Sequence, residues 1–129
     1  MAELKVFYEG NLSTKCVHLE SGCEVKTQIS QLSPTELFAA SLGSCVLTVM
    51  ALAAEKMGID FSGAKVHILK EMSRTLPRRV GSLILHFTSP ALLNDEICSK
   101  LEKIAEDCPI HHSLHPDIHV EFYFKWGVF

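Results

Sequence analysis

The chain has 129 residues, of which 47% are apolar and 21% charged, the balance of a globular protein with a hydrophobic core. We therefore expect one domain over residues 1–129. A formal net charge of −3 provides no basic stripe for phosphate backbones, which argues against nucleic acid as a partner. The cysteines number five, an odd count, and the first residues lack a secretory signal pattern. We expect a cytoplasmic protein with reduced thiols.

Three short strands are predicted first, over residues 4–8, 15–19 and 24–29, because apolar and polar residues alternate there between glycine-containing turns. Residues 37–54 follow without a charge. Their serines and glycine, and clear signals at both helix ends, favour a buried helix over a membrane span. No membrane partner is therefore expected.

The start of this helix is marked by Ser33 and Glu36, which form a capping box around Pro34. Lys56 and Gly58 suit its C-terminal end. Because the helix is apolar around its whole circumference, we predict that protein encloses it on all sides. It is then the centre of the domain or of a dimer.

The second half of the chain alternates between strands and helices. Two strands are predicted over residues 64–74 and 80–88, and an amphipathic helix over 90–107, with Leu92 or Leu93 among its inward-facing residues. A helical turn over 108–115 and a last strand over 119–126 complete the chain. The fold class is α+β, with the order βββ-α-ββ-α-α-β.

Cys45 lies about three turns into the charge-free helix. One interpretation is a small core residue, the common situation of a free cysteine. The other is a reactive thiol, since Ala40, Ser41 and Ser44 on the preceding turns leave room for a second element or a peroxide. Both interpretations stay open for this position alone.

Cys108 directly precedes Pro109 at the start of a helical turn, which places it at the N-cap. Unpaired amides and the positive helix end stabilise a thiolate there, so we expect a lowered pKa and a reactive sulfur. Serine or aspartate would serve better as a simple cap, which favours a functional thiol. The remaining cysteines have no such support and are interpreted as incidental; they are Cys16, Cys23 and Cys98.

Four histidines follow Cys108 within eleven residues: His111, His112, His115 and His119. Their spacing could supply metal ligands, but no second ligand pair accompanies them at zinc-site spacing. His111 or His112 could instead influence the cysteine or a substrate, and exposed histidines on a polar turn explain each one most simply. A metal site through Cys108 is a minor alternative, and no cofactor is expected.

Two segments resemble the signatures of the OsmC/Ohr superfamily, the osmotically inducible protein C and organic hydroperoxide resistance proteins. One is Pro-Thr-Glu-Leu-Phe-Ala-Ala-Ser-Leu-Gly-Ser-Cys, ending at Cys45, and the other is Cys-Pro-Ile-His-His-Ser-Leu, beginning at Cys108, 63 positions later. The order of the predicted elements also matches, so the resemblance covers nearly the whole chain. It implies an intertwined homodimer with two long central helices and two active sites at the subunit interface.

The resemblance also implies a cysteine-based peroxidase that protects against oxidative stress. In the family's peroxidases the first cysteine attacks an organic hydroperoxide, releases an alcohol and becomes a sulfenic acid. The second condenses with it to a disulfide, which a dithiol reductant reopens. By this resemblance Cys45 is the peroxidatic and Cys108 the resolving cysteine. The apolar surroundings of Cys45 suit an alkyl or lipid hydroperoxide better than hydrogen peroxide.

The activating residues depart from the family pattern. The family's peroxidases hold the thiolate with an arginine from the N-terminal strands, paired with a glutamate ten residues before the cysteine. This chain has no arginine before Arg74, and Thr35 stands at the glutamate's position with Glu36 next to it. A lysine such as Lys15 could supply a point charge but not the planar fork of a guanidinium. We infer a divergent branch of the superfamily.

Two functions of different classes therefore stay open. The first is enzymatic, the thiol-dependent reduction of organic hydroperoxides through Cys45 and Cys108. The second is an OsmC-like redox sensor or small-ligand-binding protein with little peroxidase turnover.

Overall fold

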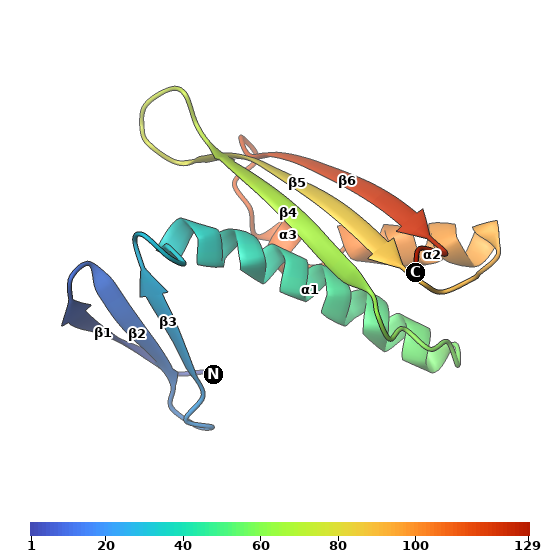
Figure 1. Cartoon of the computed structure of the whole chain (residues 1–129), viewed down its shortest axis with the longest axis horizontal. Helices are drawn as coiled ribbons and strands as arrows, with labels where there is room; N and C mark the ends of the chain where they lie inside the picture. Colours follow the sequence, from blue (N-terminus) through green and yellow to red (C-terminus); the bar gives the residue numbers. More distant parts are fainter. The chain divides into compact units, whose positions relative to one another are not determined.

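A computed structural model describes all residues, Met1–Phe129. Three strands, a long helix, two strands, two helices and a final strand follow one another in the predicted order (Figure 1). The predicted α+β class is thus confirmed. The chain forms two compact units, Met1–Phe38 and Ala39–Phe129.

The first unit contains an antiparallel meander of β1 (Leu4–Gly10), β2 (Ser13–His18) and β3 (Glu24–Gln28). The β1–β2 turn is tight, and three successive residues there have positive φ angles: Gly10, Asn11 and Leu12. Most apolar side chains of this sheet are exposed, and Thr27 is its buried residue. The sheet therefore has apolar surface left to cover.

Helix α1 (Pro34–Lys56) begins with the predicted capping box. The Ser33 amide donates to Glu36 Oε1 at 2.8 Å, and the Glu36 amide donates to Ser33 Oγ at 3.3 Å. These two bonds satisfy amides that the first helical turn cannot pair internally. The chain leaves the helix after Lys56 through Gly58, whose φ of +70° suits a helix C-terminus.

The prediction that α1 is enclosed on all sides is wrong for the single chain. Its buried residues share one face: Ala39, Leu42, Gly43, Val46, Met50 and Ala54. Other apolar positions are open, and Leu52 is 55% exposed. The physical reason is that the sheet and helices of one chain pack against one face of α1 and leave the opposite face exposed. By length and composition α1 could also cross a membrane, a test that core helices of soluble proteins pass as well.

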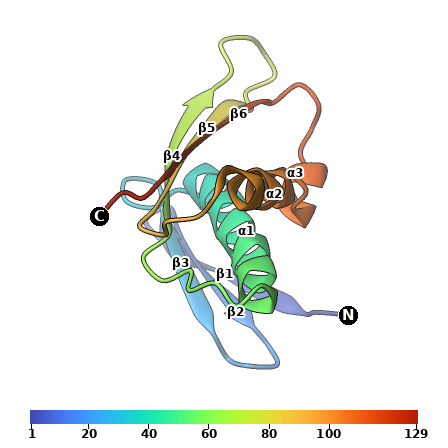
Figure 2. The same cartoon turned by 90° about the vertical axis from the view of Figure 1, so that its right-hand side faces the viewer.

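The second unit is built around a three-stranded sheet in the order β4-β5-β6. β4 (Lys65–Met72) and β5 (Val80–Ser89) are antiparallel, whereas β5 and β6 (His119–Trp126) are parallel. A parallel pair needs a crossover connection, which here contains α2 (Asp95–Glu106) and α3 (Pro109–His112). The helices lie on one face of this sheet (Figures 1 and 2).

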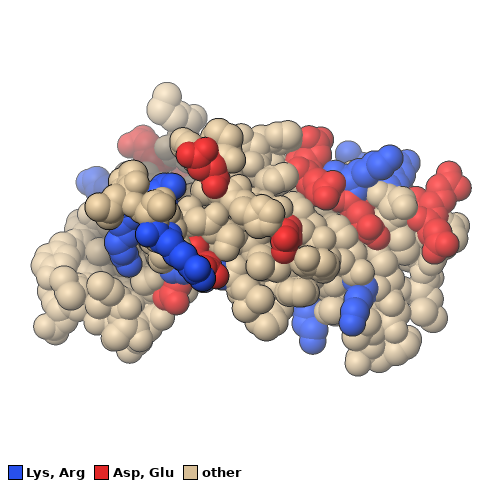
Figure 3. Space-filling model, turned by 90° about the horizontal axis from the view of Figure 1, so that it is seen from above, with Lys and Arg blue, Asp and Glu red and all other residues tan.

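The core of the second unit is formed where α1, α2 and the central strand β5 meet. Its fully buried members include Leu42, Val46, Met50, Leu83, Leu85, Phe87, Leu101 and Ala105. Gly43 lets α1 approach β4 closely, because a Cβ atom there would lie 2.5 Å from Ile68 Cδ1. On the face shown in Figure 3, acidic and basic side chains are interspersed, and neither sign forms a continuous band.

The ends of several elements differ from the predicted ones by one or two residues, the usual uncertainty of such ends. The amphipathic helix differs more, since it begins at Asp95 and not at residue 90. Asn94 is its N-cap, and Asn94 Oδ1 accepts a hydrogen bond from the Ile97 amide at 2.9 Å. Leu92 therefore lies in a loop and is 79% exposed. Likewise, α3 ends at His112 and not at residue 115.

Candidate functional site

The fold brings the thiols of Cys45 and Cys108 together. The side chain of Cys45 lies close enough to raise the pKa of Cys108, although 63 positions separate the two residues in the sequence. Cys45 lies midway along α1, and Cys108 directly precedes α3. Both are free cysteines, so the site contains two neighbouring reduced thiols.

Cys108 occupies the predicted N-cap position, with extended backbone angles of −81° and 149°. Pro109 follows as the first helical residue, where the missing amide hydrogen costs nothing. The Sγ atom accepts a hydrogen bond from the His111 amide at 3.3 Å. The bond from the His111 amide thus orients the Cys108 side chain toward the start of α3.

The prediction of a lowered pKa for Cys108 is wrong. Burial raises the pKa of the Cys108 thiol, because the charged form loses its hydration when the side chain is fully enclosed. The amide of His111 lowers the pKa, but this effect is smaller than that of burial, and neighbouring Cys45 raises the pKa further. Burial therefore favours the neutral thiol at Cys108.

The two thiols differ in accessibility. Cys108 is 0% exposed, whereas Cys45 is half-buried. Among the small residues on the turns that precede Cys45, Ala40 and Ser44 are exposed and Ser41 is half-buried. Cys45 is thus the more exposed of the two cysteines.

The histidines near Cys108 point their rings to other partners. His111 Nδ1 is 2.6 Å from the carbonyl oxygen of Glu106, and its ring packs edge-on against Phe122. His112 pairs with Asp107. His111 therefore contacts the Cys108 sulfur through its backbone amide, and neither ring hydrogen-bonds to a thiol.

The predicted metal alternative finds no support in the arrangement of donors. His115 lies near Asp117 and His119 near Glu121, so each imidazole has its own carboxylate. No group of three histidine, cysteine or acidic side chains in the chain is arranged to hold a metal ion.

The other candidate auxiliary residues have local contacts. Glu36 caps α1, and the hydroxyl groups of Thr35 and Ser33 are 3.4 Å apart. Lys15 Nζ lies over the ring of Phe7, 5.4 Å from its centre. The three arginines of the chain all lie in the loop between β4 and β5. No cationic side chain is among the groups that shift the pKa of Cys108.

Comparison with known proteins assigns the chain to a family. Residues 27–122 match the family model described as OsmC-like protein, and this range includes both cysteines of the pair. The chain belongs to the OsmC-like family. No functionally curated protein matches it.

Solved structures of OsmC-like proteins share the fold. A crystal structure from Psychrobacter arcticus, titled as an osmotic stress induced and detoxification response protein, is 34% identical and has a TM-score of 0.90. The match covers 97% of this chain and 96% of that one. The organic hydroperoxide resistance protein OsmC of Legionella pneumophila is 17% identical, with a TM-score of 0.71 over 97% and 96% of the two chains. OhrB of Bacillus subtilis is 15% identical, with a TM-score of 0.68 over 97% and 98%.

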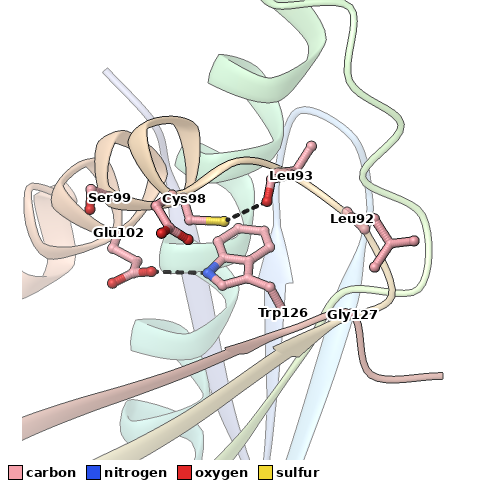
Figure 4. Close-up of a pocket in the computed structure, with 9 residues that line it drawn as sticks. Leu92, Leu93, Cys98, Ser99, Glu102, Trp126 and Gly127 are labelled. Atoms are coloured by element: carbon pink, nitrogen blue, oxygen red, sulfur yellow. Dashed lines mark hydrogen bonds between the residues drawn. The ribbon is translucent and has the colours of Figure 1, made fainter.

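The structure of this OsmC-like protein also has a cavity that sequence reasoning did not predict. It has a volume of 630 Å³ and lies beside the first half of α2, where Cys98 and Trp126 contribute to its lining (Figure 4). No motif surrounds Cys98 in the sequence, so nothing there points to a cavity. The one local indication of the cavity is Trp126, the only tryptophan of the chain, at the end of a strand, but its hydrogen-bond partner Glu102 is remote in sequence.

Proposed function

We propose that this OsmC-like protein reduces organic hydroperoxides with Cys45 as the peroxidatic and Cys108 as the resolving cysteine. One observation carries the proposal: a half-buried cysteine and a buried cysteine lie close together, so that Cys45 raises the pKa of Cys108. The organic hydroperoxide resistance proteins among the structural neighbours support this substrate class.

The cycle has three balanced steps. The thiolate of Cys45 attacks the outer peroxide oxygen, the O–O bond breaks, and the alkoxide takes a proton to leave as an alcohol. Cys45 is then a sulfenic acid. The Cys108 sulfur attacks the Cys45 sulfur, an S–S bond forms, and water leaves. A dithiol reduces this disulfide and is itself oxidised to a disulfide.

The proximity of the two thiols supports the second step. A disulfide requires Cβ atoms about 3.5–4.5 Å apart, which side-chain movements can bring about between neighbouring cysteines. Rapid condensation removes the sulfenic acid before a second peroxide can oxidise it irreversibly. The raised pKa of Cys108 fits a cycle in which Cys45 reacts first, since Cys108 acts only after Cys45 has been oxidised.

The proposal includes a homodimer of single OsmC-like domains spanning residues 1–129. The exposed apolar residues of α1 and of the first sheet support a second copy as the covering partner. A cytoplasmic location is part of the proposal, because dithiol reductants keep cysteines reduced there.

A second function, a redox sensor or ligand-binding protein with little turnover, is favoured by one observation. No side chain of a lysine, arginine or histidine is hydrogen-bonded to either thiol, since His111 contacts Cys108 through its backbone amide, and an uncompensated thiolate in apolar surroundings is costly. In this case the same disulfide forms slowly, and no dithiol sustains a cycle.

Consumption of cumene hydroperoxide in the presence of a dithiol separates the two functions. We expect sustained turnover by the wild type and a loss of at least about 100-fold in Cys45→Ser, because a serine hydroxyl cannot be oxidised to replace the sulfenic acid. Cys108→Ser should react once and then accumulate sulfinic acid on Cys45.

Cys16→Ser is the matched control, since Cys16 lies on β2 and has no place in the proposed cycle. Turnover in Cys45→Ser equal to the wild type would refute the proposed mechanism. A stoichiometric disulfide without turnover would instead establish the redox sensor.

A further inference from the structure

A second site lies at the opposite end of α2 from the thiol pair. The cavity of 630 Å³ is bounded by the loop before α2, by the first half of α2 and by the end of β6 (Figure 4). Neither Cys45 nor Cys108 lines it. Its function is therefore separable from the peroxide cycle.

Hydrogen bonds hold the walls of this cavity together. Trp126 Nε1 donates to Glu102 Oε2 at 2.9 Å, which ties β6 to α2 (Figure 4). The Gly127 amide donates to the Ala91 carbonyl at 3.1 Å and ties β6 to the loop. The site is thus preformed, which lowers the ordering cost of binding.

The cavity carries negative charge without a cation to balance it. Asp95 and Glu102 line it, and no lysine, arginine or histidine does. Glu102 uses one carboxylate oxygen for the indole, and no hydrogen bond occupies the other. The pKa of Cys98 is raised, first by burial and then by Glu102 and Asp95, so the negative potential extends to the inner wall.

The remaining lining suits an apolar body next to a positive charge. Leu92, Leu93 and the indole of Trp126 provide apolar surface beside the two carboxylates. An indole ring attracts cations through the negative potential of its face. Acidic groups beside an indole and two leucines are complementary to an ammonium group that bears a short hydrocarbon chain.

We propose that this cavity binds an organic cation, a primary or quaternary ammonium with a short alkyl chain. The charge of Asp95 and Glu102 attracts the ammonium into the cavity, and the alkyl chain contacts Leu92, Leu93 and Trp126. This site goes beyond the reduction of hydroperoxides and does not depend on it.

The test uses hexyltrimethylammonium as the probe and Trp126 as the reporter, because it is the only tryptophan of the chain. We expect a saturable change in tryptophan fluorescence with hexyltrimethylammonium. Hexanoate, which has a similar chain and the opposite charge, and hexanol, which is neutral, should bind at least about fivefold more weakly.

Glu102→Gln tests the charge while retaining an oxygen that can accept the indole hydrogen bond. It should weaken hexyltrimethylammonium binding about fivefold, measured by fluorescence and by titration calorimetry. Glu96→Gln is the matched control, because Glu96 is exposed on the same helix and does not line the cavity. It should bind as the wild type does.

The proposal is overturned if hexanoate or hexanol binds as tightly as the cation, if no saturable binding occurs, or if both glutamine variants weaken binding equally. Cys45→Ser should bind hexyltrimethylammonium normally, which makes the result independent of peroxidase activity. Loss of binding in that variant would also contradict the separation of the two sites.

Discussion

At the scale of single residues, Cys108 combines two opposing influences. A helix N-terminus favours a thiolate, while complete burial favours the neutral thiol, and burial has the larger effect on the pKa. The sequence shows the cap, since it is local, but it does not show how deeply the cap is enclosed. Enclosure depends on elements that are remote along the chain, such as α1.

This balance predicts the pH dependence of stability. A raised folded-state pKa contributes stability that is complete below the unfolded thiol pKa of about 8.5 and is lost as pH rises through the raised value. In reductant, the free energy of unfolding of the wild type should therefore fall relative to Cys108→Ala above about pH 8.5. Urea unfolding at several pH values measures this difference. A wild type that instead gains stability over Cys108→Ala as pH rises toward about 8.5, with no further change above it, would indicate a lowered pKa.

Among the auxiliary residues, proximity in sequence is a poor guide to chemistry. His111 and His112 follow Cys108 closely, yet their rings contact the Glu106 carbonyl and Asp107. The sequence likewise has no motif position that carries a cation next to Cys45.

At the scale of elements, the sequence predicted the bounds of a helix or strand correctly where residues adjacent in sequence determine them. The last strand, His119–Trp126, has the predicted bounds, and the capping box starts α1 as expected. The start of α2 was misplaced because Leu92 and Leu93 continue the helical period into a loop, while Asn94 supplies a stronger cap.

The capping box yields a test of the role of Glu36. Ser33→Ala should lower the free energy of unfolding by about 1 kcal/mol, because an N-terminal amide loses its partner. Glu36→Gln preserves an acceptor for the Ser33 amide and should lower the free energy of unfolding by only about 0.3 kcal/mol. Chemical denaturation gives both values. Peroxidase activity should survive in Glu36→Gln, and its loss would assign Glu36 a catalytic role.

At the scale of the whole molecule, α1 connects the fold to the proposed assembly. Its sequence predicts enclosure on all sides, but a single chain buries one face only. The exposed apolar face of α1 is the physical argument for a second copy, because exposed leucine on a largely apolar helix is costly in water.

A leucine-to-glutamate change tests the assembly. Leu52→Glu should shift the protein from dimer to monomer, since a buried charge at an apolar interface is unfavourable. Leu76→Glu is the same change at a loop position that is 90% exposed and should leave the dimer intact. Sedimentation equilibrium measures both masses. A monomeric wild type, or equal effects of both changes, contradicts the proposed interface.

The proposed peroxidase cycle rests on the proximity of Cys45 and Cys108. Mass spectrometry of an unreduced digest, after treatment with one equivalent of cumene hydroperoxide, tests it most directly. We predict a peptide pair joined by a Cys45–Cys108 disulfide, with the other cysteines unmodified. Sulfinic acid on Cys45 beside a free Cys108 thiol, or no oxidation of Cys45 at all, would contradict the proposed cycle.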